Sequence, residues 1–101
     1  MGEKWNSRTE ILIGKKAIEK LEKANVIIYG IGGVGSYVAE ALARAGIGNL
    51  TLVDHDVITD SNINRQIHAT TKTVGKNKVD VMKKRIQEIN PDCQVIGVTQ
   101  F

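Results

Sequence analysis

A glycine-rich turn in the first third of the chain constrains the fold more than any other feature. Gly30, Gly32 and Gly35 are spaced as G-x-G-x-x-G and directly follow the apolar run Asn25–Tyr29. This run is too short for a helix, is rich in β-branched residues and is bounded by glycine, which predicts a strand. A helical pattern follows the turn. In a strand–turn–helix unit the glycines permit the tight bend, the approach of a phosphate to backbone N–H groups and close helix–strand packing.

The helix after the turn is expected to be amphipathic and to end at Gly46. Its apolar face is predicted to consist of Val34, Val38, Ala41, Leu42 and Ala45, which recur at helical spacing. Alanines at positions 39, 41, 43 and 45 favour a helix and let its backbone approach a neighbouring layer closely.

The same alternation of strand and helix continues to the end of the chain. A second buried strand is predicted at 50–53 and is followed by Asp54-His55-Asp56. A helix is expected within 75–90, because Val79, Met82, Ile86 and Ile89 share one face and Pro91 forbids continuation. A third strand is predicted at about Gln94–Val98. Carboxylates thus stand at the carboxyl end of the second strand, the edge where ligands bind in parallel sheets.

Two helical segments are predicted before the first strand. Ser7 and Glu10 have the spacing of a capping box, which indicates a short helix into 11–13. Lys15–Lys23 continues with a single apolar stripe of Ala17, Ile18 and Leu21.

The predicted fold is α/β: a Rossmann-like, doubly wound, mainly parallel sheet that is incomplete, with about three strands, behind a short helical N-terminal extension. We expect residues 1–24 to form the extension and residues 25–101 to form the Rossmann-like nucleotide-binding part. The strand Asn25–Tyr29 is expected to be buried on both faces, as is usual for parallel sheets.

Length, hydrophobic content, net charge and cysteine content limit the classes of protein to which the chain can belong. A chain of 101 residues with 42% hydrophobic residues can form one small core. The net charge of +3 permits an RNA or nucleotide partner without requiring one. The single cysteine, Cys93, fits a reducing compartment and is expected to be a buried strand residue. Because no apolar stretch reaches membrane-spanning length, we expect a cytoplasmic protein without membrane contact.

The turn alone does not distinguish a dinucleotide from ATP. Asp54 lies where a carboxylate can bind ribose hydroxyls in either kind of site. Polar and cationic residues follow it along the chain: Asp56, Asn62, Arg65, Gln66, Lys76 and Lys78. Two or three cations suit a triphosphate, since Arg and Lys neutralise its charge. Three classes stay open: an ATP-dependent adenylating enzyme or its fragment, an NAD-binding oxidoreductase domain, and a noncatalytic nucleotide-binding module.

The histidines do not predict a metal site. His55 and His68 are far apart and lack Cys, Asp or Glu partners at ligand spacing, so they are expected to be structural or surface residues.

Several segments together resemble a known family. They are Arg8 through Gly14, Gly30 through Ser36, Gly48 through Asp56, Asn62 through Gln66, and Gly75 through Lys78. In this order they resemble the ThiF/MoeB/HesA superfamily, relatives of the ubiquitin-activating enzymes, and are most similar to its tRNA threonylcarbamoyladenosine dehydratases. Such enzymes use ATP to convert a carboxylate into an acyl-adenylate.

The resemblance implies roles for individual residues. Asp54 would hold the ribose hydroxyls, Asn62 and Arg65 the phosphates, and Lys78 the phosphates or the ribose edge. Arg8 matches an arginine that reaches the ATP of the neighbouring subunit in a homodimer. The candidate catalytic residues are therefore Arg8, Arg65 and Lys78. The candidate nucleotide-binding residues are Gly30, Gly32, Gly33, Gly35, Asp54, Asp56, Asn62, Arg65 and Lys78, and no metal ligand is assigned.

The resemblance also implies a substrate class. The sequences of segments 8–14 and 62–68 are similar to the corresponding segments of the dehydratases. In those enzymes ATP activates the threonylcarbamoyl carboxylate on tRNA so that it cyclises. Enzymes that activate a ubiquitin-like sulfur-carrier protein share Ser61 and Asn62. Their reaction is therefore the alternative, and an NAD-binding oxidoreductase domain is the second alternative.

Family members continue beyond the position of Phe101, into further strands and an acidic Mg²⁺-binding motif. The resemblance thus implies that the chain is an N-terminal portion that lacks the Mg²⁺ ligand and is inactive alone. If the strand order is 3-2-1-4, strand Asn25–Tyr29 lies at an edge, and we expect this edge to drive self-association.

Overall fold

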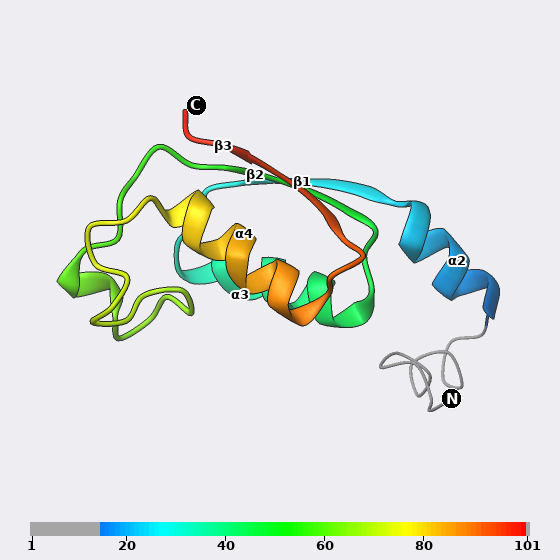
Figure 1. The fold of residues 1–101 in the computed structure, drawn as a ribbon, viewed down its shortest axis with the longest axis horizontal. Helices are drawn as coiled ribbons and strands as arrows, with labels where there is room; N and C mark the ends of the chain where they lie inside the picture. Colours follow the sequence, from blue (N-terminus) through cyan, green and yellow to red (C-terminus); the bar gives the residue numbers. More distant parts are fainter. Residues whose placement is uncertain (1–14, 101) are drawn as a thin grey trace.

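The computed structural model describes residues 15–100, which form three strands and three α-helices around one core (Figure 1). The elements are α2 (Lys15–Lys23), β1 (Asn25–Tyr29), α3 (Gly33–Ala45), β2 (Asn49–Val53), the 3₁₀ turn η1 (Asp60–Asn62), α4 (Lys78–Ile89) and β3 (Gln94–Val98). The predicted helix start near Ser7 and the candidate Arg8 lie outside the described residues. Within 15–100, no helix is both long and apolar enough to cross a membrane.

The three strands form a parallel sheet in the order β1-β2-β3. Val26 is in register with Leu50, and Leu50 with Val95. Helices α3 and α4 lie side by side beneath one face of this sheet, and α2 lies beyond the start of β1 (Figure 1). The predicted α/β class with about three parallel strands is confirmed.

The hydrophobic patterns predicted the positions of the helices and strands correctly because glycine and proline residues mark where these elements end. Gly46 adopts the left-handed conformation at φ 101°, and its N–H bonds the carbonyls of Leu42 and Ala43, which ends α3. Helix α4 ends at Ile89, and its C-cap Asn90 stands directly before Pro91. Strands β1 and β3 have the predicted bounds, and β2 begins one residue earlier than predicted.

The core lies between the sheet and the two helices. Leu50 and Leu52 of β2 pack with Val79, Met82 and Ile86 of α4, all at most 1% exposed. Full burial of one such side chain contributes roughly 1.5–3 kcal/mol. Cys93 is also buried, as expected, but immediately precedes β3 instead of lying within it. Its burial raises the pKa of the thiol.

The apolar face predicted for α3 matches its buried face only in part. Leu42 packs against the core as predicted, but Val34 is 80% and Val38 41% exposed. The fully buried residues are instead Ser36, Ala39 and Ala43. The helix passes so close to β1 that mainly small side chains fit between them, and apolar periodicity alone did not find them.

The expectation that β1 is buried on both faces is also wrong. Ile28 is buried against the helices, but Ile27 is 55% and Tyr29 70% exposed on the opposite face. Ile96 of β3, in register with Thr51, is 60% exposed. Both described crossover helices lie on one side of the sheet, so no described element covers the other. We call Ile27, Tyr29, Thr51, Ile96 and Val98 the open sheet face.

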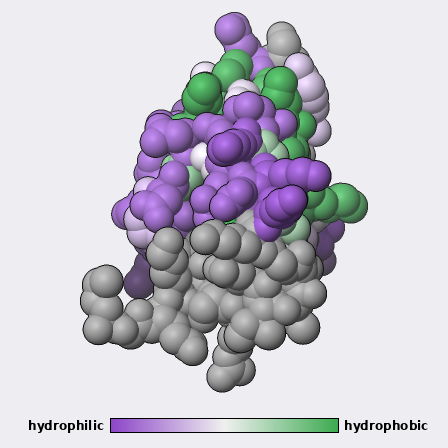
Figure 2. All heavy atoms as spheres, turned by 90° about the vertical axis from the view of Figure 1, so that its right-hand side faces the viewer, coloured by the Kyte–Doolittle hydropathy of each residue, from purple (hydrophilic) through white to green (hydrophobic). Residues whose placement is uncertain are grey.

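The surface is amphipathic at the end of the molecule that carries α2. Viewed from there, hydrophilic side chains cover most of the described surface, and hydrophobic ones gather toward the top, where the sheet lies (Figure 2). Within α2, Ile18 is buried and Leu21 packs on the core, whereas Lys16, Glu19 and Lys20 are exposed. The predicted apolar stripe of α2 is confirmed.

Candidate functional site

The glycine turn connects β1 to α3 at the carboxyl end of the sheet. Gly30 has φ 90°, which residues with a side chain rarely adopt, and its N–H donates to the Val53 carbonyl at 2.8 Å. A Cβ at Gly35 would lie 1.9 Å from the Gly30 carbonyl oxygen. Both glycines are therefore required by the backbone, and the first N–H groups of α3 are left without intrahelical partners at the turn.

Asp54 fastens the turn to the end of β2. The residue is 5% exposed, and its Oδ2 accepts the Ile31 N–H at 2.7 Å while its Oδ1 accepts the Asp56 N–H at 2.8 Å. The Asp56 carbonyl in turn accepts the backbone N–H of Lys78 at 3.1 Å, at the start of α4. The carboxylate predicted at this edge is thus linked to both the glycine turn and α4.

The segment after η1 lies over the first turn of α3. A Cβ at Gly33 would lie 3.8 Å from the Arg65 carbonyl oxygen, and one at Gly32 would lie 3.7 Å from Gln66 Nε2. The Ile67 N–H donates to Ser36 Oγ at 3.3 Å. Residues about 30 positions apart in the chain therefore meet at the glycine turn.

Asn62 holds this segment in shape. Its Oδ1 accepts the Thr59 N–H at 2.9 Å, while its carbonyl accepts the N–H of Arg65 and of Gln66. The residue is 7% exposed. Its short side chain can therefore cap the turn that precedes it, while its backbone carbonyl accepts the hydrogen bonds of the turn that follows.

The two predicted cationic residues differ in exposure. Arg65 is exposed, and its Nη1 donates to the Ser61 carbonyl at 2.7 Å and to Asn64 Oδ1 at 3.2 Å. Lys78 is only 7% exposed at the N-terminus of α4. These two bonds hold the Arg65 guanidinium against Ser61 of η1 and Asn64, and leave its other N–H groups available as donors.

His68 also contacts the turn, and the sequence analysis assigned it no function. Its Nε2 lies 2.6 Å from the Ile31 carbonyl oxygen, and the residue is 2% exposed. Burial lowers the pKa of the imidazole, against the opposing effect of the bond to Ile31. His55, by contrast, is exposed, with Nε2 3.2 Å from Asp56 Oδ1.

The structure thus brings most of the predicted site together. Hydrogen bonds and backbone contacts join the glycine turn, Asp54, Asp56, Asn62, Arg65 and Lys78 around the carboxyl end of the sheet. Gln66 and His68 were named in the sequence analysis without a role at the turn. The only indication of such a role was that both residues lie in the segment 62–68, whose sequence resembles the family.

The cluster that follows β2 does not fit a magnesium ion. The expectation that His55 lacks acidic partners at ligand spacing is wrong, because one ligand atom each of Asp54, His55 and Asp56 lies within 4.8 Å of the others. Mg²⁺ prefers oxygen ligands to imidazole, however, so His55 is a poor ligand for it. Within this cluster Asp56 is the carboxylate whose oxygens accept no backbone N–H group, and its Oδ1 already lies 3.2 Å from His55 Nε2.

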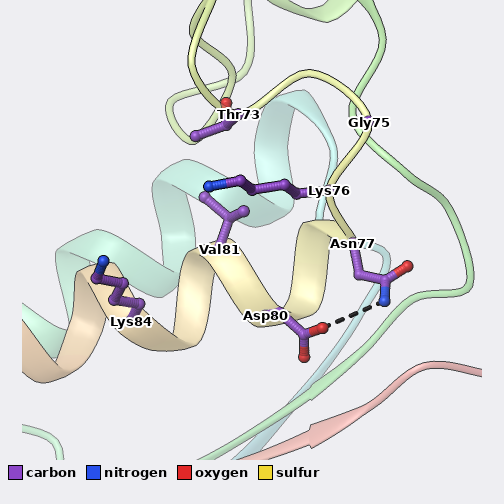
Figure 3. Close-up of a pocket in the computed structure, with 7 residues that line it drawn as sticks. All are labelled: Thr73, Gly75, Lys76, Asn77, Asp80, Val81 and Lys84. Carbon is purple, nitrogen blue, oxygen red and sulfur yellow. Dashed lines mark hydrogen bonds between the residues drawn. The ribbon is translucent and has the colours of Figure 1, made fainter.

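A separate hollow of about 460 Å³ lies on the outer side of α4. It is lined by Thr73, Gly75, Lys76, Asn77, Asp80, Val81 and Lys84 (Figure 3). The Asn77 amide donates to Asp80 Oδ2 at its edge. None of the predicted nucleotide-binding residues lines this hollow, so it is distinct from the glycine turn.

Known proteins are similar to the chain over most of its length. Residues 6–101 match the model of the ThiF family. The chain is 53% identical over 95 residues to the tRNA threonylcarbamoyladenosine dehydratase of Bacillus subtilis, covering 94% of the chain and 37% of that protein. It is 39% identical to the sulfur carrier protein adenylyltransferase of Thermus thermophilus, covering 82% of the chain and 31% of that protein.

A solved structure agrees in fold. The E. coli tRNA N6-threonylcarbamoyladenosine dehydratase in complex with ATP superposes with a TM-score of 0.93 at 49% identity, over 95% of the chain and 40% of that structure. The chain therefore spans well under half the length of the relatives it matches. On the match across residues 6–101, the chain belongs to the ThiF family.

Proposed function

We propose that the protein binds ATP at the glycine turn and uses it to adenylate a carboxylate, that of threonylcarbamoyladenosine in tRNA. The observation that carries the proposal is the convergence of an α-helix N-terminus, a buried aspartate and the arginine-bearing segment 62–66 on one turn. The similarity to dehydratases, one of them solved with ATP, supports the choice of nucleotide and substrate.

Each part of this arrangement suits a part of ATP. The N–H groups at the start of α3, which spans 13 residues, favour phosphate oxygens through their partial positive charge. Asp54 accepts one N–H on each oxygen, which leaves further lone pairs for ribose hydroxyls. Arg65 and Lys78 supply positive charge for the phosphates, with Asn62 holding the segment that carries Arg65.

The chemistry then requires positioning and charge stabilisation and no nucleophile from this chain. A substrate carboxylate oxygen attacks the α-phosphorus, and the bond to the β-phosphate oxygen breaks to release pyrophosphate. Arg65 and Lys78 stabilise the charge that develops on the phosphates. The adenylated carboxyl group then cyclises with loss of AMP.

The family resemblance further implies that the protein acts as a homodimer, and we include this in the proposal. Arg8 would reach the ATP of a second copy, so each homodimer would hold two composite sites. If so, Arg8→Ala mixed with a variant defective in its own turn should restore one working site per mixed dimer.

Exchange of labelled pyrophosphate into ATP tests the reaction and its substrate together. The native-length protein is incubated with ATP, labelled pyrophosphate and one of three additions: tRNA carrying threonylcarbamoyladenosine, the same tRNA without the modification, or a sulfur-carrier protein with a free C-terminal carboxylate. Exchange that depends on the modified tRNA is the expected result.

The other outcomes are equally informative. Exchange that depends on the carrier protein would favour the alternative supported by the Thermus thermophilus relative, with the same adenylation chemistry. Absence of exchange with every substrate, from protein shown to bind ATP, would refute adenylation and leave a nucleotide-binding module.

A further inference from the structure

Ile31, in the middle of the glycine turn, is held at both of its backbone polar groups by side chains. Its N–H donates to Asp54 Oδ2 at 2.7 Å, and its carbonyl oxygen lies 2.6 Å from His68 Nε2. Ile31 itself is fully buried. The two side chains come from the end of β2 and from the segment between η1 and α4, so distant parts of the chain meet on a single residue.

The chemistry of this contact defines the tautomer of His68. A carbonyl oxygen can only accept, so Nε2 must carry the proton. Because burial lowers the pKa of the ring, His68 is neutral near pH 7 and its Nδ1 keeps a lone pair. That Nδ1 is buried without a hydrogen-bond partner in the described residues, and so is Gln66 Oε1.

Two buried acceptors without hydrogen-bond partners are costly. Packing alone would be better served by apolar side chains of similar size at 66 and 68. The polar residues here are therefore explained better by what their other atoms do. For His68 that is the bond from Nε2 to the Ile31 carbonyl oxygen, while Gln66 Nε2 would lie 3.7 Å from a Cβ placed at Gly32.

The bond to the Ile31 carbonyl controls the direction of the next N–H group. The Ile31 carbonyl and the Gly32 N–H belong to one planar trans peptide and point in opposite directions. Fixing the oxygen toward His68 therefore fixes the Gly32 N–H on the other side of the turn. Glycine at 32 offers no side chain that could resist rotation of this peptide.

We propose that His68 is a positioning residue that aims the Gly32 N–H at the bound nucleotide by holding the Ile31 carbonyl. This inference rests on the proposed function, since it assigns His68 to the same nucleotide site. It differs from a packing role because it depends on a hydrogen-bond donor at the position of Nε2.

Three variants of the native-length protein separate these roles. His68→Leu keeps bulk and removes the donor. His68→Gln places an amide N–H near the position of Nε2. Ile86→Val weakens the core beneath α4, away from the turn, and serves as a control for general destabilisation.

The measurements are ATP affinity by calorimetry, KM and kcat in pyrophosphate exchange, the thermal midpoint, and the amide resonance of Gly32. His68→Leu should lower ATP affinity about tenfold, raise the KM for ATP more than it changes kcat, and shift the Gly32 amide resonance. His68→Gln should recover affinity to within about threefold of the wild type. Ile86→Val should lower the thermal midpoint by a few degrees and leave ATP affinity unchanged.

Three results would overturn the proposal in different ways. A folded His68→Leu protein with wild-type ATP affinity and an unshifted Gly32 resonance would refute the role of His68 while leaving ATP binding intact. Failure of the wild type to bind ATP would refute the proposed function and this role with it. If His68→Leu does not fold, failure of folded His68→Gln to retain affinity would equally overturn the proposal.

Discussion

At the scale of single residues, side chains from later segments hold the glycine turn. Asp54 and His68 clamp Ile31, and the Arg65 carbonyl lies against Gly33. Asp54 and Arg65 could be named from the sequence because their residue types match the chemistry of ribose and phosphate. His68 could not, because its contact with Ile31 spans 37 positions and follows no local pattern.

Arg65→Ala tests the phosphate role at this scale. Because Arg65 is exposed, its removal should change the free energy of unfolding by no more than about 0.5 kcal/mol. Loss of a charged phosphate contact should weaken ATP binding about 10- to 100-fold in calorimetry.

Arg44→Ala is the matched control. Arg44 is an exposed arginine on α3 whose Nε lies 3.3 Å from Glu40, and it contacts no residue of the turn. ATP affinity should be unchanged in Arg44→Ala. Equal losses in the two variants would show that net charge, rather than a contact from Arg65, governs binding.

At the scale of elements, periodicity and helix stops predicted where helices and strands lie, but not which faces they bury. The bounds of α2, β1 and β3 follow from short apolar runs between glycine, proline and polar residues. The buried stripe of α3 was only partly predicted because close helix–strand approach selects small residues such as Ala39 and Ala43. The path of 55–77 was beyond prediction. Most of its hydrogen bonds are local, but the contacts that place it on the glycine turn, from Ile67 to Ser36 and from His68 to Ile31, span more than 30 positions.

Gly35→Ala tests the close approach of α3 to β1. A Cβ there would lie 1.9 Å from the Gly30 carbonyl oxygen, so the backbone must move. We expect a loss of about 2 kcal/mol in the free energy of unfolding by denaturant titration. Gly33→Ala is the control, since its nearest neighbour lies at 3.8 Å and its change should stay within about 1 kcal/mol. Equal stability of both variants would contradict the packing described.

An ion pair between α3 and α4 should make stability depend on acid pH. Arg85 donates a hydrogen bond to Glu40, which lowers the pKa of the carboxyl below its usual value of 4.5. The unfolded chain therefore binds more protons than the folded one in this range. The stabilisation is fully present above pH 4.5 and is lost as pH falls through the folded pKa.

Glu40→Gln tests this assignment. The variant should lose about 1 kcal/mol of unfolding free energy at neutral pH and show a flatter decline in that free energy below pH 4.5. An unchanged acid profile in Glu40→Gln would refute the role of the pair.

His68 affects stability at a higher pH than Glu40. Its pKa is lowered from 6.5 in the folded protein, so its contribution to the unfolding free energy declines as pH falls below 6.5.

At the scale of the whole molecule, the open sheet face is the main unsatisfied feature of the described chain. Strand β1 is at the edge of the sheet, as the order 3-2-1 implied, and Ile27, Tyr29 and Ile96 are more than half exposed. Exposed apolar faces and free strand edges favour association.

We expect the 101-residue chain to self-associate at micromolar concentrations in sedimentation velocity. The double variant Tyr29→Asp, Ile96→Lys should shift the distribution toward monomer without unfolding, because both side chains are exposed. Gln87→Asp on the exposed side of α4 should leave association unchanged. A wild-type chain that sediments as a monomer throughout the range would contradict this expectation.

The central claim, an ATP site at the glycine turn, is tested most directly by calorimetric titration of the native-length protein with ATP and with NAD. The convergence of Asp54, Arg65 and Lys78 on the turn predicts saturable ATP binding with one site per subunit, weakened by Arg65→Ala, and no comparable binding of NAD. Selective binding of NAD, or ATP binding that is indifferent to Arg65, would contradict the account.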